Sequence, residues 1–406
     1  MAEEAKIDRL GHRGDGIAAG AAGDIYVPGA LPGERVLLQG EGARRRLVGI
    51  VSASPDRTLP ICRHYDRCGG CAVQHLAPGA AAEWKHRMVA DALASRGIVA
   101  ETGETWTAPD ASRRRAVFSL ARFGGKSVLG FHEARSNRIL DVAECPVLVP
   151  QIATRLAALK RLGEPFAPRS GAAAMHVLAV RNGLDVAISP AGTERLPPDV
   201  TGRMQTAGVV RLSLDGALAL QLEPPVLDMA GIAVVPPPAA FVQASAEAEA
   251  EMARLAGEWL RDCAMVADLF SGMGALSLSL ARNMQVTAFD LDAAAMGALE
   301  AALRGATGLK PVRVMRRDLF RVPLQANELS AFDGAIFDPP RAGAAAQAAQ
   351  LAASHVRKLV AISCNPATLA RDLRMLLDGG YRLVRVVPLD QFRHAAHVEA
   401  VALLER

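Results

Sequence analysis

The sequence lacks any run of 18 uncharged apolar residues, and charged side chains appear within its first few positions. A membrane-spanning helix needs such a run, and a secretory signal needs an apolar segment near the N-terminus. We therefore expect a soluble, cytoplasmic protein with no membrane partner. Cysteine is also scarce, with six residues in 406. In a reducing compartment so few thiols indicate metal binding or catalysis, and they argue against a disulfide scaffold.

Lysine is scarce as well, since it supplies only six of the 46 basic residues and arginine supplies the rest. Arginine favours two-point contacts with phosphate and stacking on bases, although a biased genome composition would give the same excess. Between residues 61 and 170 the chain has 16 Lys or Arg against 10 Asp or Glu. An anionic partner would therefore meet the middle of the chain.

Three segments of the chain differ in pattern, as expected for a length that exceeds one hydrophobic core. Residues 1–55 have short β-like runs separated by glycines, which predicts a small OB-like β-barrel that binds RNA or serves only for packing. Residues 56–235 contain a cysteine cluster, a helical stretch and alternating segments, which predicts a small central α/β domain. Residues 236–406 alternate helical and strand-like runs.

This alternation in residues 236–406 predicts a parallel, doubly wound α/β sheet. The predicted strands cover 264–269, 286–289, 312–315, 333–337 and 358–363, and the predicted helices cover 247–262, 275–282, 293–303 and 347–355. Two further strand-like runs, 381–387 and 397–404, are close enough to form an antiparallel edge hairpin. That ending distinguishes a Rossmann-like class I methyltransferase sheet from an ordinary dinucleotide-binding fold.

Four of the six cysteines form the pattern Cys62-x5-Cys68-x2-Cys71 with Cys145 farther along the chain. Three close thiols and a distant fourth can complete a tetrahedral thiolate site for zinc or an iron–sulfur cluster. A single zinc ion is more often held by two short Cys pairs, so the spacing favours the cluster. Zinc, or no metal, remains as the alternative.

A glycine-containing loop follows the first predicted strand of the doubly wound sheet. Gly272 and Gly274 let a ligand approach the backbone, but Ser277 stands where a dinucleotide fingerprint has its third glycine. A ligand without pyrophosphate fits better. Asp290 ends the next strand, where a carboxylate can accept from both ribose hydroxyls, and the combination predicts S-adenosylmethionine. Asp318 could meet the adenine or be an exposed loop residue.

Asp338 precedes two prolines at the end of another predicted strand. Carboxyl ends of central strands face the ligand crevice of a doubly wound sheet, and the prolines fix the backbone. Similar segments occur in methyltransferases that act on exocyclic amines, so Asp338 alone does not identify the acceptor atom.

Cys364 lies between the strand-like run 359–362 and an Asn-Pro pair, Asn365-Pro366, that is typical of a helix N-cap and N1. A helix N-terminus lowers the pKa of a thiol, so we expect a nucleophilic thiolate; a buried structural cysteine is the alternative. His397 and Glu399 have period-two spacing and would share one face of a strand. They could supply a base, or they could be a solvated edge.

Together these motifs resemble the RNA 5-methyluridine (uracil-C5) methyltransferase family, and within it the 23S rRNA branch. Residues 26–34 look like its RNA-binding TRAM domain, 241–243 like its Phe-Gln motif, and 363–372 like its nucleophile signature. The resemblance implies S-adenosylmethionine and a 4Fe-4S cluster as cofactors, and RNA as the partner of a monomer. The implied catalytic residues are Cys364 and Glu399, the cofactor-binding residues are Gln243, Phe270, Gly272, Gly274, Asp290, Asp318 and Asp338, and the cluster ligands are Cys62, Cys68, Cys71 and Cys145.

The implied reaction is methylation of uridine at C5, with Cys364 bonding transiently to C6 and Glu399 acting as the base. Three alternatives remain at this stage. Transfer RNA could replace 23S rRNA as substrate, an amine-directed methyltransferase would use Asp338 without the thiol, and a non-catalytic RNA-binding protein would rest on the barrel and the arginines alone.

Overall fold

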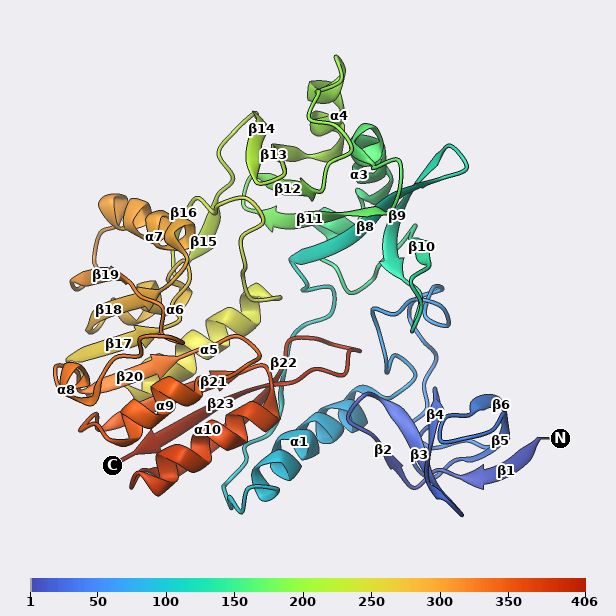
Figure 1. Cartoon of the computed structure of the whole chain (residues 1–406), viewed down its shortest axis with the longest axis horizontal. Helices are drawn as coiled ribbons and strands as arrows, with labels where there is room; N and C mark the ends of the chain where they lie inside the picture. The colour runs from blue at the N-terminus through green and yellow to red at the C-terminus, as the bar shows by residue number, and fades with distance from the viewer. Residues whose placement is uncertain (1) are drawn as a thin grey trace.

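The computed structural model describes residues 2–406, and Figure 1 shows the N-terminal strands, a central sheet and a C-terminal α/β layer as three groups. The N-terminal group is two three-stranded antiparallel sheets, in the orders β1-β5-β6 and β2-β3-β4. Their strands are β1 Glu3–Lys6, β2 Arg9–Leu10, β3 Asp15–Gly20, β4 Gly23–Pro28, β5 Arg35–Gln39 and β6 Arg46–Ser52. Apolar side chains from both sheets, among them Ile7, Val27 and Val36, meet in one small core.

The central group is a seven-stranded sheet in the order β10-β9-β8-β11-β12-β13-β14. All its pairs are antiparallel except β12 with β13. The strands are β8 Arg115–Phe123, β9 Lys126–His132, β10 Ile139–Asp141, β11 Ala172–Val180, β12 Gly183–Ser189, β13 Val209–Leu214 and β14 Ala217–Gln221, and the helices are α2 Pro150–Ala153, α3 Leu156–Gly163, η1 Glu164–Phe166 and α4 Val200–Ala207. Side chains of the sheet and the helices share one core, which confirms the predicted central α/β character.

The C-terminal group is built on an eight-stranded sheet in the order β19-β18-β17-β20-β21-β23-β22-β7. The five strands from β19 to β21 are parallel, which confirms the predicted doubly wound sheet. The strands are β17 Met265–Leu269, β18 Gln285–Asp290, β19 Val312–Arg316, β20 Gly334–Phe337, β21 Lys358–Ser363, β22 Arg382–Asp390 and β23 Glu399–Glu405. The helices are α5 Ala246–Trp259, α6 Ala275–Leu280, α7 Ala293–Gly305, α8 Ala326–Leu329, α9 Ala345–Ala352 and α10 Pro366–Asp378. A small two-stranded ribbon, β15 Leu227–Met229 and β16 Ile232–Val234, precedes these elements in the chain.

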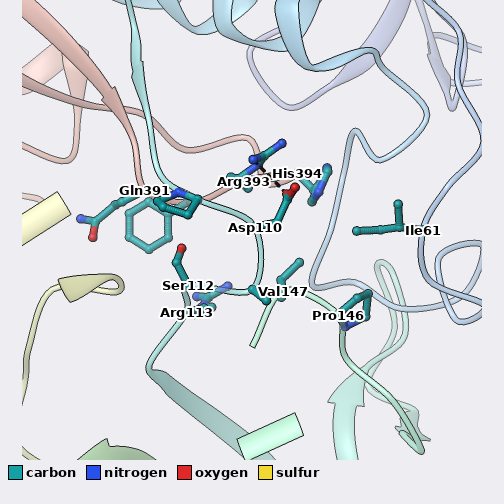
Figure 2. A pocket seen from close by; sticks show the side chains of 12 residues that line it. Ile61, Asp110, Ser112, Arg113, Pro146, Val147, Gln391, Arg393 and His394 are labelled. Carbon is teal, nitrogen blue, oxygen red and sulfur yellow. Dashed lines mark ion pairs between the residues drawn. The ribbon is translucent and has the colours of Figure 1, made fainter. Parts of the chain in front are cut away.

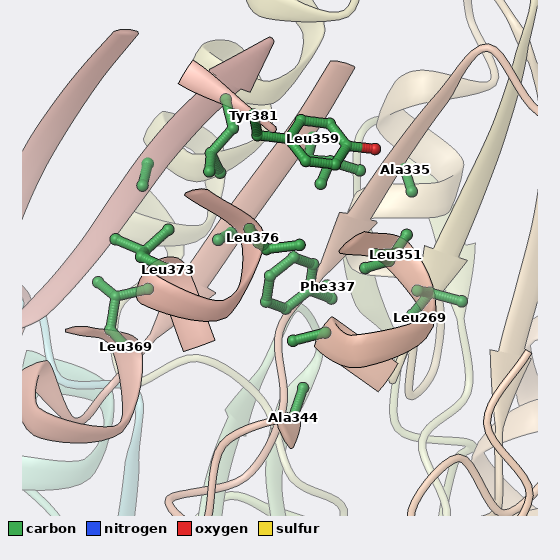
Figure 3. Packing of buried hydrophobic residues seen from close by; sticks show 14 of the residues in the cluster. Leu269, Ala335, Phe337, Ala344, Leu351, Leu359, Leu369, Leu373, Leu376 and Tyr381 are labelled. Carbon is green, nitrogen blue, oxygen red and sulfur yellow. The ribbon is translucent and has the colours of Figure 1, made fainter. Parts of the chain in front are cut away.

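Helices cover both faces of this sheet. Successive side chains of a strand point to opposite faces, so both sets of side chains are buried. Leu359 and Ala361 of β21 pack under α1 (Pro78–Ala94), α9 and α10, whereas Val360 and Ile362 pack under α5 and α6. Figure 3 shows the first of these cores, with Phe337 between leucines of α9 and α10. The continuous apolar runs of the predicted strands follow from this two-sided burial.

The antiparallel ending differs from the predicted edge hairpin in its order. β23 lies between β21 and β22, so the last strand of the chain is internal to the sheet. The outer edge of β22 is covered by β7, Trp106–Thr107, which pairs with it in parallel. Within residues 2–406, no helix combines the length and apolar character that crossing a membrane requires.

Residues 78–107 lie in the range predicted for the central domain, yet they pack on the C-terminal sheet. Helix α1, Pro78–Ala94, contacts α10 and β22, and its Val89 and Leu93 belong to the same core as α10. Figure 1 shows α1 alongside α10. Together with β7, this helix completes the C-terminal sheet from a distant part of the chain.

Candidate active site

Three of the predicted site residues follow parallel strands that end at the same edge of the sheet. Leu269 pairs with Phe337, and Phe337 pairs with Ala361, so β17, β20 and β21 are in step. Phe270 and Asp338 come directly after the first two of these strands, and Cys364 comes after the third. The carboxyl ends of a doubly wound sheet are where ligands bind.

Cys364 and Glu399 lie opposite each other at this edge. The last pair between β21 and β23 is Ser363 with Ala400, so the next residue of each strand is Cys364 and Glu399. Residues directly opposite in an antiparallel pair have their side chains on the same face. The Glu399 charge accordingly raises the pKa of the Cys364 thiol. The nucleophile and base expected from the sequence therefore share one site.

The local structure around Cys364 is as predicted, but its pKa is not. Asn365 is the N-cap of α10 and accepts from the Ala367 N–H at 3.1 Å, with Pro366 at N1. Burial of the half-buried thiol, followed by the charges of Glu399 and Asp338, raises its pKa, and Arg341 opposes them only in part. The expected lowering of the pKa by the helix N-terminus is wrong, because burial, together with two carboxylates from other strands, outweighs it.

A chain of hydrogen bonds joins Glu399 to Asp338. The Gln391 amide nitrogen donates to Glu399 Oε1 at 2.6 Å and to Gln243 Oε1 at 2.7 Å. Gln243 in turn donates to Asp338 Oδ2 at 2.9 Å. Gln391 is buried and was not among the predicted site residues, because no motif or spacing marks it in the sequence.

Burial sets the acid–base character of the two carboxyls. It raises the pKa of Glu399 to about 7, although the Gln391 hydrogen bond and the Arg115 charge act in the opposite direction. The pKa of Asp338 is raised well above its usual range, first by burial and then by the charges of Glu399 and Asp268. Within residues 2–406, Glu399 Oε2 is buried and has no hydrogen-bond partner. The Glu399 carboxylate can therefore accept a proton near neutral pH.

The glycine loop has the backbone shape expected of a ligand-binding turn. Phe270, Gly272 and Gly274 all have positive φ, at 66°, 54° and 83°. A Cβ at Gly274 would lie 2.6 Å from a methyl carbon of Leu299, so only glycine fits there. Asp290 Oδ2 accepts from the Gly272 N–H at 2.9 Å, which brings this carboxylate to the loop.

Asp318 shapes the next loop along this edge. Its Oδ1 accepts from the N–H groups of Phe320 and Arg321, both at 3.1 Å, in a local turn. The turn places the Phe320 ring 5.2 Å from the Phe270 ring. Phe320 is a large apolar side chain that is left exposed beside Asp318, and the sequence had not marked it as a site residue.

One buried carboxylate oxygen in this crevice finds no hydrogen-bond donor among residues 2–406, as a site for the amino group of S-adenosylmethionine would require. Asp268 is buried, and its Oδ2 accepts from the Ser277 hydroxyl at 2.6 Å. Its Oδ1 is buried without a partner in the described part of the chain. Burial raises the pKa of Asp268 to about 7. The amino group of S-adenosylmethionine is a cationic donor of the kind that such an oxygen lacks.

Three consecutive arginines at the start of β8 reach toward the same site from the central sheet. Arg114 is buried, pairs with Glu249 at 2.6 Å and donates to the Gln243 carbonyl at 3.1 Å, so its guanidinium is not free to contact a phosphate. The Arg115 guanidinium lies 4.6 Å from the centre of the Phe241 ring. Phe241 is 70% exposed, which leaves its ring open to a ligand.

The four cysteines predicted as metal ligands line one cavity of about 480 Å³, together with Arg113 and Arg115. Among residues 2–406, no three His, Cys, Asp or Glu side chains form a group that could hold a metal ion. Backbone N–H groups of His64 and Gly70 donate to the Cys62 and Cys68 sulfurs, both at 3.4 Å. Burial and the neighbouring thiols raise the pKa of Cys71 to about 11 and that of Cys145 to about 12. Four sulfurs are the donor type of an iron–sulfur cluster, but the described side chains are not gathered into a group that could hold one.

The doubly wound sheet, its antiparallel ending and the crevice around the glycine loop define an S-adenosylmethionine-dependent methyltransferase. The model of the tRNA (Uracil-5-)-methyltransferase family matches residues 235–406. The chain is 44% identical to an uncharacterised RNA methyltransferase of Brucella suis, over 98% of this chain and 97% of the relative. It is 33% identical to the 23S rRNA (uracil(1939)-C(5))-methyltransferase RlmD of Chromohalobacter salexigens, over 100% of this chain and 90% of the relative.

The fold is also similar to that of a solved structure from Pyrococcus abyssi, a tRNA (uracil-54, C5)-methyltransferase in complex with S-adenosyl-L-homocysteine. That comparison covers 100% of both chains with a TM-score of 0.78 at 23% sequence identity. The chain therefore belongs to the RNA (uracil-C5) methyltransferase family, and it is an S-adenosylmethionine-dependent enzyme.

Proposed function

We propose that the protein methylates C5 of one uridine in 23S rRNA through a covalent bond between Cys364 and C6 of the base. The observation that carries the reaction is the proximity of Cys364 and Glu399. They flank the last pair between β21 and β23, Ser363 with Ala400, and the Glu399 charge acts on the thiol. The 23S rRNA substrate is supported by the relative from Chromohalobacter salexigens, which matches this chain over its whole length. Transfer RNA is the second candidate, because the Pyrococcus abyssi neighbour acts on it.

Cys364 adds to C6 and makes C5 nucleophilic, since uracil C5 alone is too weak a nucleophile. S-adenosylmethionine, when bound, supplies the methyl group that C5 takes up. Glu399 then removes the C5 proton, and the electron pair of the broken C–H bond re-forms the ring double bond and expels the Cys364 thiolate. A carboxyl with a pKa of about 7 is matched to this proton transfer.

Arg115 and Phe241 are proposed to hold the uridine. Both faces of the ring must be reached, so the base leaves its stack, as in other enzymes that modify bases. An exposed aromatic ring beside a guanidinium offers one surface for stacking and one charge for the backbone. The N-terminal barrel, residues 1–55, and the central domain, residues 56–235, would contribute the rest of the RNA contact, the barrel as a TRAM-like module.

The methyl donor is proposed to occupy the crevice between the glycine loop and the ends of β18 and β19. The proposed contacts are Gln243, Phe270, Gly272, Gly274, Asp290, Asp318 and Asp338. Positive φ at the loop and the orphaned Asp268 oxygen support this assignment. We further propose that the protein acts as a monomer in the cytoplasm.

The cavity lined by Cys62, Cys68, Cys71 and Cys145 is proposed to hold a 4Fe-4S cluster with a structural role. Full-length protein purified without oxygen should then contain iron and sulfide and show iron–sulfur charge-transfer absorbance. Cys145→Ser should lose most of the iron. Cys263→Ala is the matched control, because Cys263 is buried in the methyltransferase core and should leave the iron content unchanged. Zinc in place of iron, or iron retained by Cys145→Ser, would contradict the cluster.

The decisive test of the substrate is a map of 5-methyluridine in total RNA from cells with and without this protein. We expect one uridine of 23S rRNA to lose its methyl group, and the position in the relative's name, 1939, is the first to examine. If 5-methyluridine were lost only from transfer RNA, the substrate would be transfer RNA, and the proposed reaction at C5 would still hold. An unchanged 5-methyluridine map with a lost methylated amine would contradict both.

A further inference from the structure

We propose that Gln391 is a positioning residue that determines which oxygen of Glu399 receives the C5 proton. This inference rests on the proposed function and adds to it the orientation of the base. Gln391 lies in the loop between β22 and β23, one residue beyond the end of β22. It is 3% exposed, and both polar atoms of its side chain form hydrogen bonds.

The orientation of the Gln391 amide follows from its backbone partner. The Ala244 N–H can only donate, and it donates to Gln391 Oε1 at 2.9 Å. The amide nitrogen must therefore face the other way, where its two hydrogens reach Glu399 Oε1 and Gln243 Oε1. The Gln243 amide is fixed in the same manner, because its oxygen accepts from Gln391 and its nitrogen donates to Asp338.

This arrangement makes the two oxygens of Glu399 unequal. Oε1 accepts a hydrogen bond at 2.6 Å, whereas Oε2 is buried and without a partner in the described residues. A proton on Oε1 would point at the N–H group of Gln391, which can donate a hydrogen bond but cannot accept one. In the release step the C5–H bond breaks, its proton therefore goes to Oε2, and its electron pair expels the Cys364 thiolate.

Buried contacts on both sides hold Gln391 in place. Lys85 of α1 is fully buried, pairs with Asp390 at 2.5 Å and also donates to the Phe392 carbonyl at 3.0 Å. Arg393 pairs with Asp110 at 2.9 Å, as the dashed line in Figure 2 marks. In that view the Gln391 amide points away from Arg393.

The charged and titratable groups that face Glu399 predict how the loss of Gln391 acts. Arg115 from β8 favours the charged carboxylate, whereas Asp338 after β20 and Cys364 after β21 disfavour it once they are ionised. Gln391 adds a hydrogen bond that lowers the pKa of Glu399. Without that donor the base remains protonated to higher pH, so release of the adduct should require more alkaline conditions.

The test follows formation and decay of the covalent protein–RNA adduct in single turnovers. The probe is 23S rRNA from cells that lack the protein, with S-adenosylmethionine present. For Gln391→Met, which keeps the size but has no donor, we expect adduct formation within about threefold of the unmodified protein. Decay of the adduct should slow by about 10- to 100-fold, and its half-maximal pH should rise by about one unit or more.

Gln347→Met is the matched control, since Gln347 is a fully buried glutamine that bonds only to the Leu324 backbone. It should leave the pH dependence of decay unchanged even where it lowers stability. Gln391→Leu also removes the donor without adding a charge, and it repeats the test if the methionine variant does not fold.

Equal slowing of formation and decay in the Gln391 variants, with no shift in the pH dependence, would overturn the positioning role. An unmodified protein that methylates uridine without forming an adduct would instead overturn the proposed function. The two failures are therefore distinguishable.

Discussion

Cys364→Ala is expected to abolish every covalent protein–RNA complex and to lower uridine methylation by about 10⁴-fold or more. The thiol follows the last pair between β21 and β23, beside Glu399, and alanine at this position removes the atom proposed to attack C6. Activation of C5 depends on that attack. The measurement is a rapid-quench assay of methyl transfer with denaturing gel analysis of trapped protein–RNA complexes.

Binding of S-adenosylmethionine gives the control for Cys364→Ala. Calorimetry should show little change in affinity, because the crevice residues around Asp268 and Asp290 lie on other strands. Methylation of uridine at the normal rate by this variant would refute the covalent mechanism. Methylation of an exocyclic amine would instead favour the amine-directed alternative that uses Asp338.

Glu399→Gln should let the adduct form and then persist, with turnover reduced by about 10²- to 10⁴-fold. An amide cannot take the C5 proton, so the thiolate is not expelled. The measurement is the fraction of protein found in the covalent complex during steady-state turnover. Glu405→Gln is the matched control, because Glu405 ends the same strand and contacts only Lys358 and Arg382 at its far end. Rapid release of methylated RNA by Glu399→Gln would assign the base elsewhere.

The protonation of Glu399 should affect adduct release and the stability of the folded protein in opposite directions as the pH rises. A carboxyl whose folded-state pKa is raised to about 7 must lose its proton to act, so adduct release should fail as the pH drops below 7. The same raised pKa favours the folded state only while the group is protonated, and that contribution is lost as the pH rises through 7. Glu399→Gln should therefore be at least as stable as the unmodified protein at pH 8.

The doubly wound sheet could be predicted because its signals are local. Buried strands such as β21 are continuous apolar runs, and Asn365-Pro366 begins a helix where expected. Gly274 has a positive φ, which a glycine in the sequence can signal. The insertion of β23 between β21 and β22 could not be predicted, because strand order depends on pairings between distant segments. The addition of β7 at the outer edge is unpredictable for the same reason.

The candidate site shows the same division between local and distant information. Cys364, Asp338 and Glu399 belong to short motifs and could be predicted, whereas Gln391 acts through partners as far away as Gln243. The thiol pKa was mispredicted because the sequence reveals the helix beside Cys364 but neither the burial of the thiol nor the carboxylates that distant strands bring to it. Site residues were thus easier to predict than their electrostatics.

The packing of α1 and β7 on the C-terminal sheet changes how the RNA-facing part of the molecule is attached. The central sheet, from β8 to β14, leaves the catalytic layer after β7 and returns to it before α5. The central sheet is thus an insertion that two chain segments connect to the catalytic layer, and not a domain attached by one linker. Two connecting segments restrict rotation of the central sheet relative to the catalytic layer more than one would. The buried pair between Arg114 and Glu249 of α5 adds a direct anchor beside Arg115.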